Sequence, residues 1–253
     1  MNLLTVIILT LNEETTLPQC LDSLSWFEDK LVFDSGSTDR TCDIAREHGA
    51  RVVQRSFDNY AAQRNAALCE TLSEWVLFID ADETVGSELA NEIQVAIKNQ
   101  DKVGWMIPRH NYIFGKLMLH AGWYPDYQLR LFKRESGSYF VDRHVHELLD
   151  LKGSVGNLHY PIIHQNYLDV SEFISKQRAY AKHEAHMLYK QGVVPRFHHY
   201  LLQPIRQFLW RYITLAGWRS GYHGILLCVL MAYSQYIVYR QLSSLRDSDI
   251  EAS

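Results

Sequence analysis

Residues 75–83 read Trp-Val-Leu-Phe-Ile-Asp-Ala-Asp-Glu, a continuous apolar run that ends in three carboxylates. A run that is apolar on both faces is typical of a strand in a parallel sheet covered by helices on each side. In such sheets ligands bind beyond the carboxyl ends of the strands. Side chains two positions apart on an extended backbone point to the same side. The sequence therefore predicts that Asp80 and Asp82 together face a ligand site.

Two carboxylates at a strand end are typical of a site for Mg²⁺ or Mn²⁺. These hard cations prefer oxygen ligands and keep waters and substrate phosphate oxygens in their shell, so two protein carboxylates suffice. A metal at Asp80 and Asp82 would then bridge to a diphosphate. The alternative is that both residues only begin a polar turn after the strand.

The bulk properties indicate a folded globular protein. The chain has 253 residues, enough for one large α/β domain with an appendage, and 47% of them are hydrophobic. The net charge of -4 gives no reason to expect nucleic acid as a partner. The four cysteines form no C-x-x-C pair, which favours neither a zinc site nor a disulfide framework, and a reducing cytosol is the simplest location. The apolar run Leu3–Leu9 is too short for a signal peptide and is interpreted as the first strand.

The first 100 residues alternate strands and helices. Leu31–Phe33 is followed by a turn and a helix, Arg51–Arg55 predicts a third strand, and Tyr60–Leu72 predicts a helix before the strand at 75–79. Strands and helices that alternate in this way form right-handed crossovers and a parallel sheet. Polar clusters follow the strands and converge on one sheet edge: Thr10, Asn12 and Glu13; Asp34; Gln63 and Arg64; and Asp80 with Asp82.

This edge has the groups that a nucleoside diphosphate requires. A ribose or base edge requires a carboxylate acceptor, and a diphosphate requires a metal and a bidentate cation such as arginine. The chain has neither G-x-x-x-x-G-K-[ST] nor G-x-G-x-x-G, which disfavours a P-loop nucleotidase and a dinucleotide oxidoreductase.

Four ordered motifs resemble the family 2 inverting glycosyltransferases: Thr10–Glu13, Val32–Asp39, Ala62–Asn65 and Asp80–Asp82. Within that family the chain is similar to lipopolysaccharide core glycosyltransferases of the β-1,4-glucosyltransferase type. The resemblance implies a UDP-sugar donor, with Asp34 at the uracil ring, Arg64 at the diphosphate region, and Asp80 and Asp82 at the metal. It also implies a lipid-linked saccharide acceptor such as the lipopolysaccharide inner core.

The expected fold is α/β, a mostly parallel central sheet flanked by helices in a single Rossmann-like nucleotide-sugar transferase domain. This catalytic domain is expected over residues 1–165, with a donor half at 1–100 and an acceptor half at 101–165. The acceptor half is rich in histidine and aromatic residues, which suit a saccharide. Residues 166–253 are expected to form a helical region.

An inverting transferase needs one base for the acceptor hydroxyl. Family members place an acidic pair after a strand such as Gln128–Arg134. Here Val145-His146-Glu147 follows, with histidine in the first position, so Glu147 is the candidate base and Asp126 is the alternative. His146 and His164 are candidates to complete the metal shell. The alternative is that each histidine has only a structural role, as a hydrogen-bonded side chain.

The C-terminal region predicts contact with a membrane surface. Arginines alternate with tryptophan and tyrosine in residues 200–214, and residues 224–239 are almost wholly apolar. This pattern suits the lipid headgroup region and favours a peripheral anchor on the cytoplasmic face of the membrane. The alternative is a helical hairpin that packs on the catalytic domain or in a homo-oligomer. Two further functions stay open: a polyprenyl-phosphate glycosyltransferase and an inactive sugar-binding scaffold.

Overall fold

The computed structural model describes residues 3–139 and 149–251, with side chains to Arg246. The chain divides into two compact units. The first comprises Met1–His110 and Asp126–His164, and the second comprises Asn111–Pro125 and Gln165–Ser253. The segment 111–125, which the sequence placed in the acceptor half, thus belongs with the C-terminal helices.

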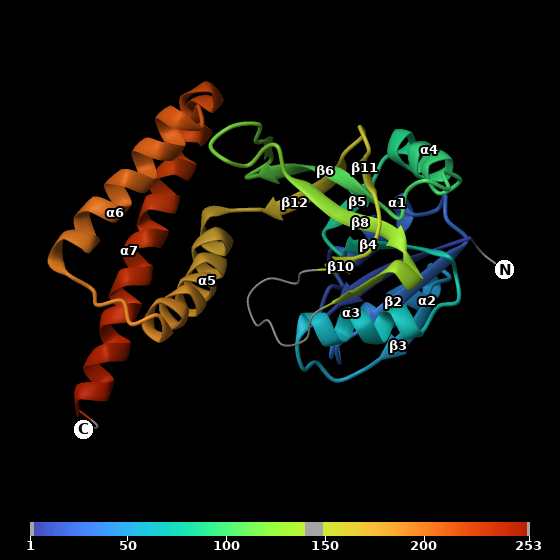
Figure 1. Ribbon diagram of the computed structural model, residues 1–253, viewed down its shortest axis with the longest axis horizontal. Helices are drawn as coiled ribbons and strands as arrows, with labels where there is room; N and C mark the ends of the chain where they lie inside the picture. The colour runs from blue at the N-terminus through green and yellow to red at the C-terminus, as the bar shows by residue number, and fades with distance from the viewer. Residues whose placement is uncertain (1–2, 140–148, 252–253) are drawn as a thin grey trace. The chain divides into compact units, whose positions relative to one another are not determined.

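The parallel part of the sheet is formed by the four strands that the apolar runs predicted. They are β1 (Leu4–Thr10), β2 (Asp29–Asp34), β3 (Arg51–Gln54) and β4 (Trp75–Asp80), in the order β3-β2-β1-β4 (Figure 1). Residues 75–79 of β4 are all buried, as expected for a strand covered on both faces. Thr10 pairs with Asp34 and Leu9 pairs with Asp80, so β2 and β4 end on either side of β1 at one edge.

Beyond β4 the sheet becomes antiparallel. Strand β8 (Tyr127–Lys133) pairs with β4, so that Leu77 lies opposite Leu131. The order continues through β6 (Gly104–Ile113), β12 (Ile162–Tyr167) and β5 (Glu83–Val85). The short strands are β7 (Lys116–Leu117), β9 (Gly137–Tyr139), β10 (Leu149–Leu151) and β11 (Val155–Asn157), with a 3₁₀ turn η1 (Arg134–Ser136). The predicted α/β sheet flanked by helices is confirmed, with a mixed rather than uniform strand direction.

Alternate side chains of the central strands pack on opposite faces of the sheet. Ile8 and Ile79 belong to one core cluster with residues of the helices α1 (Leu17–Ser23), α2 (Thr41–Glu47) and α4 (Ser87–Ala96). Ile7 and Phe78 belong to a second cluster, with residues of α3 (Tyr60–Cys69). Full burial of such side chains stabilises the fold by about 1.5–3 kcal/mol each. This two-sided core fixes the strand ends at which the polar residues lie.

The second unit is mainly helical. It contains α5 (Val170–Lys190), α6 (Phe197–Leu209), the π-helical turn η2 (Trp210–Thr214), η3 (Gly217–Ser220) and α7 (Gly221–Glu251). Asp169 caps α5, because its carboxylate accepts a hydrogen bond from the backbone N–H of Glu172. The segment Gly217–Arg246 contains an 18-residue window with a mean hydropathy of 1.3, so by length and composition alone it could cross a membrane.

Candidate functional site

Asp80, the last residue of β4, lies between two arginines. Arg130 of β8 contacts both of its carboxylate oxygens, and Nη2 of Arg64 lies 3.7 Å from Oδ1. The Arg64 guanidinium also lies over the rings of Phe78 and Tyr139, at 4.9 Å and 5.6 Å from their centroids. Burial opposes ionisation of Asp80, but the guanidinium groups of Arg130 and Arg64 outweigh it and hold the pKa of this carboxyl well below its usual range. Asp80 is therefore an ionised carboxylate whose charge two arginines already balance.

Glu83 extends this network into the protein interior. It is fully buried, and its Oε1 accepts hydrogen bonds from Arg130 at 3.1 Å and Arg109 at 3.2 Å. Its Oε2 accepts the backbone N–H of Asp80 at 3.0 Å. Burial raises the pKa of Glu83 against the pull of Arg130, and the negative charge of Asp80 raises it further. Glu83 thus holds Arg130 and Arg109 at the end of β4.

Asp82, two residues after Asp80, lies beside a histidine. Its Oδ2 is 3.2 Å from Nε2 of His164, which comes from β12. The two residues are 82 positions apart in the chain. The side chain of Asp82 is 29% exposed and that of His164 only 10%, so the histidine is buried and the carboxylate is more open to solvent.

The charges at this edge suit a divalent cation. Three guanidinium groups, of Arg64, Arg109 and Arg130, are set among four carboxylates. The group therefore has no net positive charge with which to hold a diphosphate. Asp82 and His164 are the oxygen and nitrogen donors here that could hold a metal, whereas Asp80 is engaged by arginine. Within residues 3–139 and 149–246, no cluster of three or more metal-ligating side chains occurs, so substrate oxygens or water would complete the shell.

Asp34 is fully buried at the end of β2, and its carboxylate organises the loop that follows. Thr10 and Ser37 donate their hydroxyl groups to Oδ1, whereas the backbone N–H groups of Gly36 and Ser37 and the side chain of Gln54 donate to Oδ2. Burial opposes ionisation, but these hydrogen bonds outweigh it and lower the pKa of Asp34. The assignment of Asp34 to the uracil ring stays a prediction, and the structure shows the carboxylate shaping the loop.

Replacing Asp34 with alanine is expected to lower the free energy of unfolding by about 3 kcal/mol, because hydrogen bonds to a charged group contribute about 1.5–3 kcal/mol. The loop would also lose its shape, so the KM for the donor should rise. The stabilisation is present above the unfolded-state pKa of about 3.9 and is lost as the pH falls through the lower folded pKa. Urea denaturation and donor kinetics check both effects. Asp58→Ala, which removes an exposed carboxylate beside Arg55, is the control and should change little.

Asn12 and Glu13 join the loops after β1 and β2. Asn12 has a left-handed backbone with a φ of 57°, and its side chain accepts the N–H of Thr38 at 2.9 Å. The backbone N–H of Glu13 donates to Oγ1 of Thr41 at 2.8 Å, and the carboxylate of Glu13 accepts the hydroxyl of Thr16. Both residues therefore hold the segments after β1 and β2 together. Their predicted contact with substrate stays a prediction.

Gln63 is a buried residue in the first turn of α3. Its side-chain amide donates to Oγ of Ser35 and to the carbonyl of Arg55, and Arg55 donates to its Oε1 at 2.9 Å. Gln63 therefore ties α3 to the ends of β2 and β3. This arrangement sets the position of the neighbouring Arg64.

The structure describes only one of the two candidate bases, Asp126. Glu147 lies outside the described residues, as does His146. Asp126 precedes β8, and its two oxygens accept hydrogen bonds from Arg109 at 2.8 Å and Gln128 at 2.6 Å. An acceptor hydroxyl would have to compete with both donors for this carboxylate.

Sequence reasoning gave no role to Arg130 or Glu83, and placed Arg109 only in the acceptor half. The sequence did contain two signals for these residues: Arg130 lies in the predicted strand 128–134, and Glu83 is the third carboxylate of the 75–83 stretch. An arginine in a strand otherwise rich in apolar residues requires a buried carboxylate partner, and this rule would have suggested Asp80 or Glu83.

Arg130→Met is expected to lower the free energy of unfolding by about 3–5 kcal/mol, because removing one partner of a buried ion pair leaves uncompensated carboxylates. Arg46→Met, which breaks an exposed pair with Asp43, is the matched control and should cost less than about 1 kcal/mol. Urea denaturation of both variants measures the difference. Equal, small decreases in the free energy of unfolding of the two variants would mean that the buried carboxylates of Asp80 and Glu83 do not need the charge of Arg130.

The sheet that changes from parallel to antiparallel, with carboxylates and arginines at the end of β4, defines a nucleotide-sugar transferase fold. The chain belongs to glycosyl transferase family 2, whose sequence model matches residues 5–145, more than half of its length. The predicted membership of this family is therefore confirmed, and the chain is a glycosyltransferase.

Similar proteins support this assignment. The chain is 30% identical over 235 residues to the lipopolysaccharide core biosynthesis glycosyltransferase LpsC of Rhizobium meliloti, covering 88% of this chain and 85% of the relative. It is 25% identical to the uncharacterized glycosyltransferase RT0209 of Rickettsia typhi, covering 100% of this chain and 89% of that one. The mannosyltransferase PcManGT of Pyrobaculum calidifontis, solved with GDP-Man and Mn²⁺, matches with a TM-score of 0.55 at 15% identity, over 97% of this chain and 86% of that chain. This likeness shows the shared fold.

Proposed function

We propose that the protein is a metal-dependent inverting glycosyltransferase that moves a sugar from a UDP-sugar to a lipid-linked saccharide. The observation that carries the proposal is the end of β4, where Asp82 lies 3.2 Å from His164 beside the Asp80–Arg130 pair. A catalytically inactive scaffold would have no need to keep these groups together.

Asp82 and His164 would hold a Mg²⁺ or Mn²⁺ ion, with Asp80 at the nucleotide side of the site. A divalent cation bound there supplies positive charge for the leaving diphosphate. Arg64 lies beside Asp80 and is placed to contact the diphosphate with its guanidinium. The loops anchored by Asp34 and Asn12 would enclose the nucleoside.

Inversion requires that an acceptor hydroxyl loses its proton as it attacks the sugar carbon. Glu147 is the proposed base. Asp126 is the alternative, although Arg109 and Gln128 already hydrogen-bond to it. Glu83 and Arg109 would position the strand ends without touching the reacting atoms.

The acceptor is inferred from the relatives and from the C-terminal unit. LpsC is named as an enzyme of lipopolysaccharide core biosynthesis, which suggests a saccharide acceptor on a lipid. Such an acceptor lies at the cytoplasmic face of a membrane, where we place the protein as a peripheral enzyme. A polyprenyl phosphate is the second candidate acceptor.

A panel of nucleotide sugars tests the proposal. Purified protein would be incubated with Mn²⁺, a lipooligosaccharide acceptor and each of several UDP-sugars, with GDP-mannose included, while release of the nucleoside diphosphate is measured. We expect acceptor-dependent release from a UDP-sugar. Release from GDP-mannose alone would change the donor class, transfer to polyprenyl phosphate alone would change the acceptor, and no release from any donor would contradict the proposal.

A further inference from the structure

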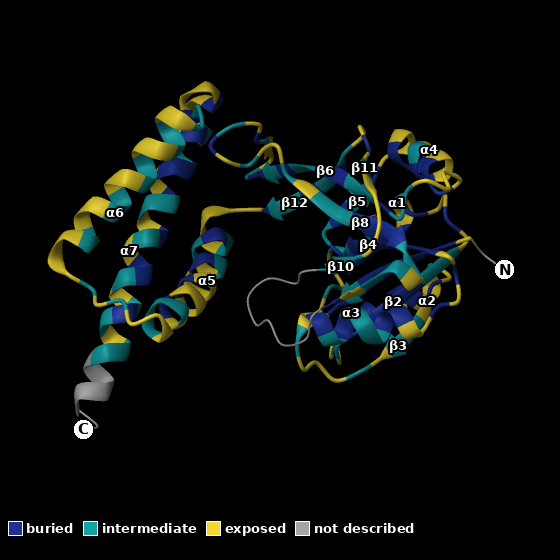
Figure 2. Cartoon of the chain, viewed as in Figure 1, coloured by how far each residue is buried: buried dark blue, intermediate teal, exposed yellow. Residues whose placement is uncertain are grey.

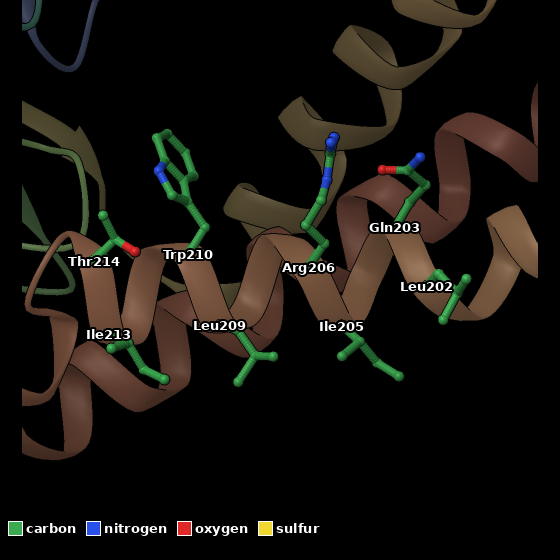
Figure 3. A pocket seen from close by; sticks show the side chains of 8 residues that line it. All are labelled: Leu202, Gln203, Ile205, Arg206, Leu209, Trp210, Ile213 and Thr214. Carbon is green, nitrogen blue, oxygen red and sulfur yellow. The ribbon is translucent and has the colours of Figure 1, made fainter.

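Helix α6 and the turn η2 show an unusual distribution of side chains. The residues of this stretch that are turned toward solvent are mainly large and apolar: Leu201, Leu202, Ile205, Leu209, Trp210 and Ile213, which are 45–62% exposed. Figure 3 shows Leu202, Ile205, Leu209 and Ile213 projecting from one side of α6–η2, whereas Arg206 and Trp210 project from the opposite side. A helix in a water-soluble unit normally exposes polar residues and buries apolar ones.

The less exposed side of the same helix mixes polar and aromatic residues. Gln203, Gln207 and Arg211 lie on it together with Phe208 and Tyr212, and no residue of α6 is fully buried. Helix α5 of the same unit provides the comparison, because its exposed positions include Arg178, Lys182, His183 and Glu184 (Figure 2). The apolar exterior is therefore particular to α6–η2 and to the outer side of α7.

The charges around this surface have one sign. Residues 191–246 contain six arginines and no aspartate or glutamate, although the whole chain has a net charge of -4. Arg196, Arg206, Arg219 and Arg240 are exposed. Arginines beside exposed tryptophan and leucine suit the headgroup layer of a membrane that contains anionic lipids.

We propose that the exposed face of α6–η2 docks in the plane of an anionic lipid bilayer. Leu202, Ile205, Leu209 and Ile213 would enter the boundary between headgroups and acyl chains. Arg206 and Arg219 would contact lipid phosphates. The inference deepens the proposed function, since it rests on an acceptor that lies in a membrane.

The packing of α7 explains why docking occurs in the plane and not across the bilayer. Leu227 and Leu230 of α7 pack against Phe173 of α5, and Ile237 and Val238 pack against Ala181. Ser234 of α7 donates a hydrogen bond to Gln177 of α5. A spanning α7 would carry the charged side of α5 into the hydrocarbon core, which is costly.

Docking would also position the loop 111–125. Arg211 of η2 donates a hydrogen bond to the carbonyl of Ala121 at 2.6 Å, and the N–H of Ala121 donates to the carbonyl of Leu215 at 2.8 Å. Lys116 donates to the carbonyl of Ser220 at 3.0 Å. This segment contains His120 and Trp123 of the predicted acceptor half, and the three hydrogen bonds connect it to η2 and η3.

Vesicle co-sedimentation of the full chain tests the inference. The wild type, without donor or metal, should bind vesicles of phosphatidylglycerol and phosphatidylethanolamine more strongly than vesicles of phosphatidylcholine. The double variant Ile205→Asp, Leu209→Asp should lower the partition coefficient by at least roughly tenfold, because charges replace inserted apolar groups. Tyr180→Asp is the control, since Tyr180 is 60% exposed on α5, and it should bind as the wild type does.

Thermal unfolding and Mn²⁺-dependent nucleotide binding of the double variant should stay unchanged, because both replaced side chains lie at the surface. Unchanged vesicle binding by the double variant would overturn the inference. Equal binding of the wild type to both kinds of vesicle would also overturn it. The same holds if the wild type does not bind vesicles but forms a dimer that the double variant cannot form. Vesicle binding by a protein that transfers no sugar would overturn the proposed function and leave this inference standing.

Discussion

Asp82→Asn is expected to lower sugar transfer by more than about 100-fold and to weaken Mn²⁺ binding. Changes to residues behind a metal ligand already cost 10–100-fold, and a direct ligand should cost more. An asparagine keeps the shape of the side chain but removes the negative charge that a divalent cation requires. Titration of Mn²⁺ by calorimetry, together with nucleotide release, measures both effects. His164→Gln should weaken Mn²⁺ binding in the same way, because its Nε2 lies 3.2 Å from the Asp82 carboxylate.

Glu92→Gln is the matched control for these variants. Glu92 forms a similar carboxylate–histidine contact with His159, at 2.8 Å, away from the strand end. Its replacement should leave Mn²⁺ affinity and turnover unchanged. Normal turnover of Asp82→Asn, or of the wild type in EDTA, would contradict a metal at this pair.

Glu147→Gln is expected to lower kcat and kcat/KM together by about 10²–10⁴-fold, the range that general acid–base groups supply. A base acts on the acceptor hydroxyl in the transition state, so donor affinity should stay nearly unchanged. Steady-state kinetics and a separate measurement of donor binding distinguish this pattern from that of Asp82→Asn, which should impair metal-dependent donor binding as well.

Asp126→Asn is the comparison for Glu147. The structure engages both oxygens of Asp126 with Arg109 and Gln128, so we expect a smaller loss of rate in this variant. A collapse of turnover in Asp126→Asn beside near-normal rates in Glu147→Gln would identify Asp126 as the base.

Local patterns were sufficient to predict the donor half of the fold. The run 75–79 is apolar on both faces because β4 contributes side chains to the cores on both sides of the sheet, and this position leaves a direct trace in the sequence. The turn residues after β2 likewise follow from local chemistry. Pairing of distant residues leaves no such trace. Arg130 meets Asp80 only because β8 runs antiparallel beside β4, with Leu77 opposite Leu131.

The C-terminal unit shows a second kind of feature that the sequence could not predict. The apolar and basic composition predicted contact with lipid, but composition cannot say which side of α6 faces α7. The structure shows that Ile205 and Leu209 lie outward while Gln207 lies on the less exposed side. It also assigns the loop 111–125 to this unit, through contacts such as Arg211 with Ala121 that join residues 90 positions apart.

Transfer of a labelled sugar into a lipid-extractable saccharide tests the central claim most directly. Wild-type protein would be incubated with a radiolabelled UDP-sugar and vesicles containing a lipooligosaccharide, once with Mn²⁺ and once with EDTA. We predict that label enters the lipid-linked saccharide with Mn²⁺ and does not enter it with EDTA or in Asp82→Asn. Equal incorporation in EDTA, or label that appears only as free sugar, would contradict a metal-dependent transferase acting on a lipid-linked acceptor.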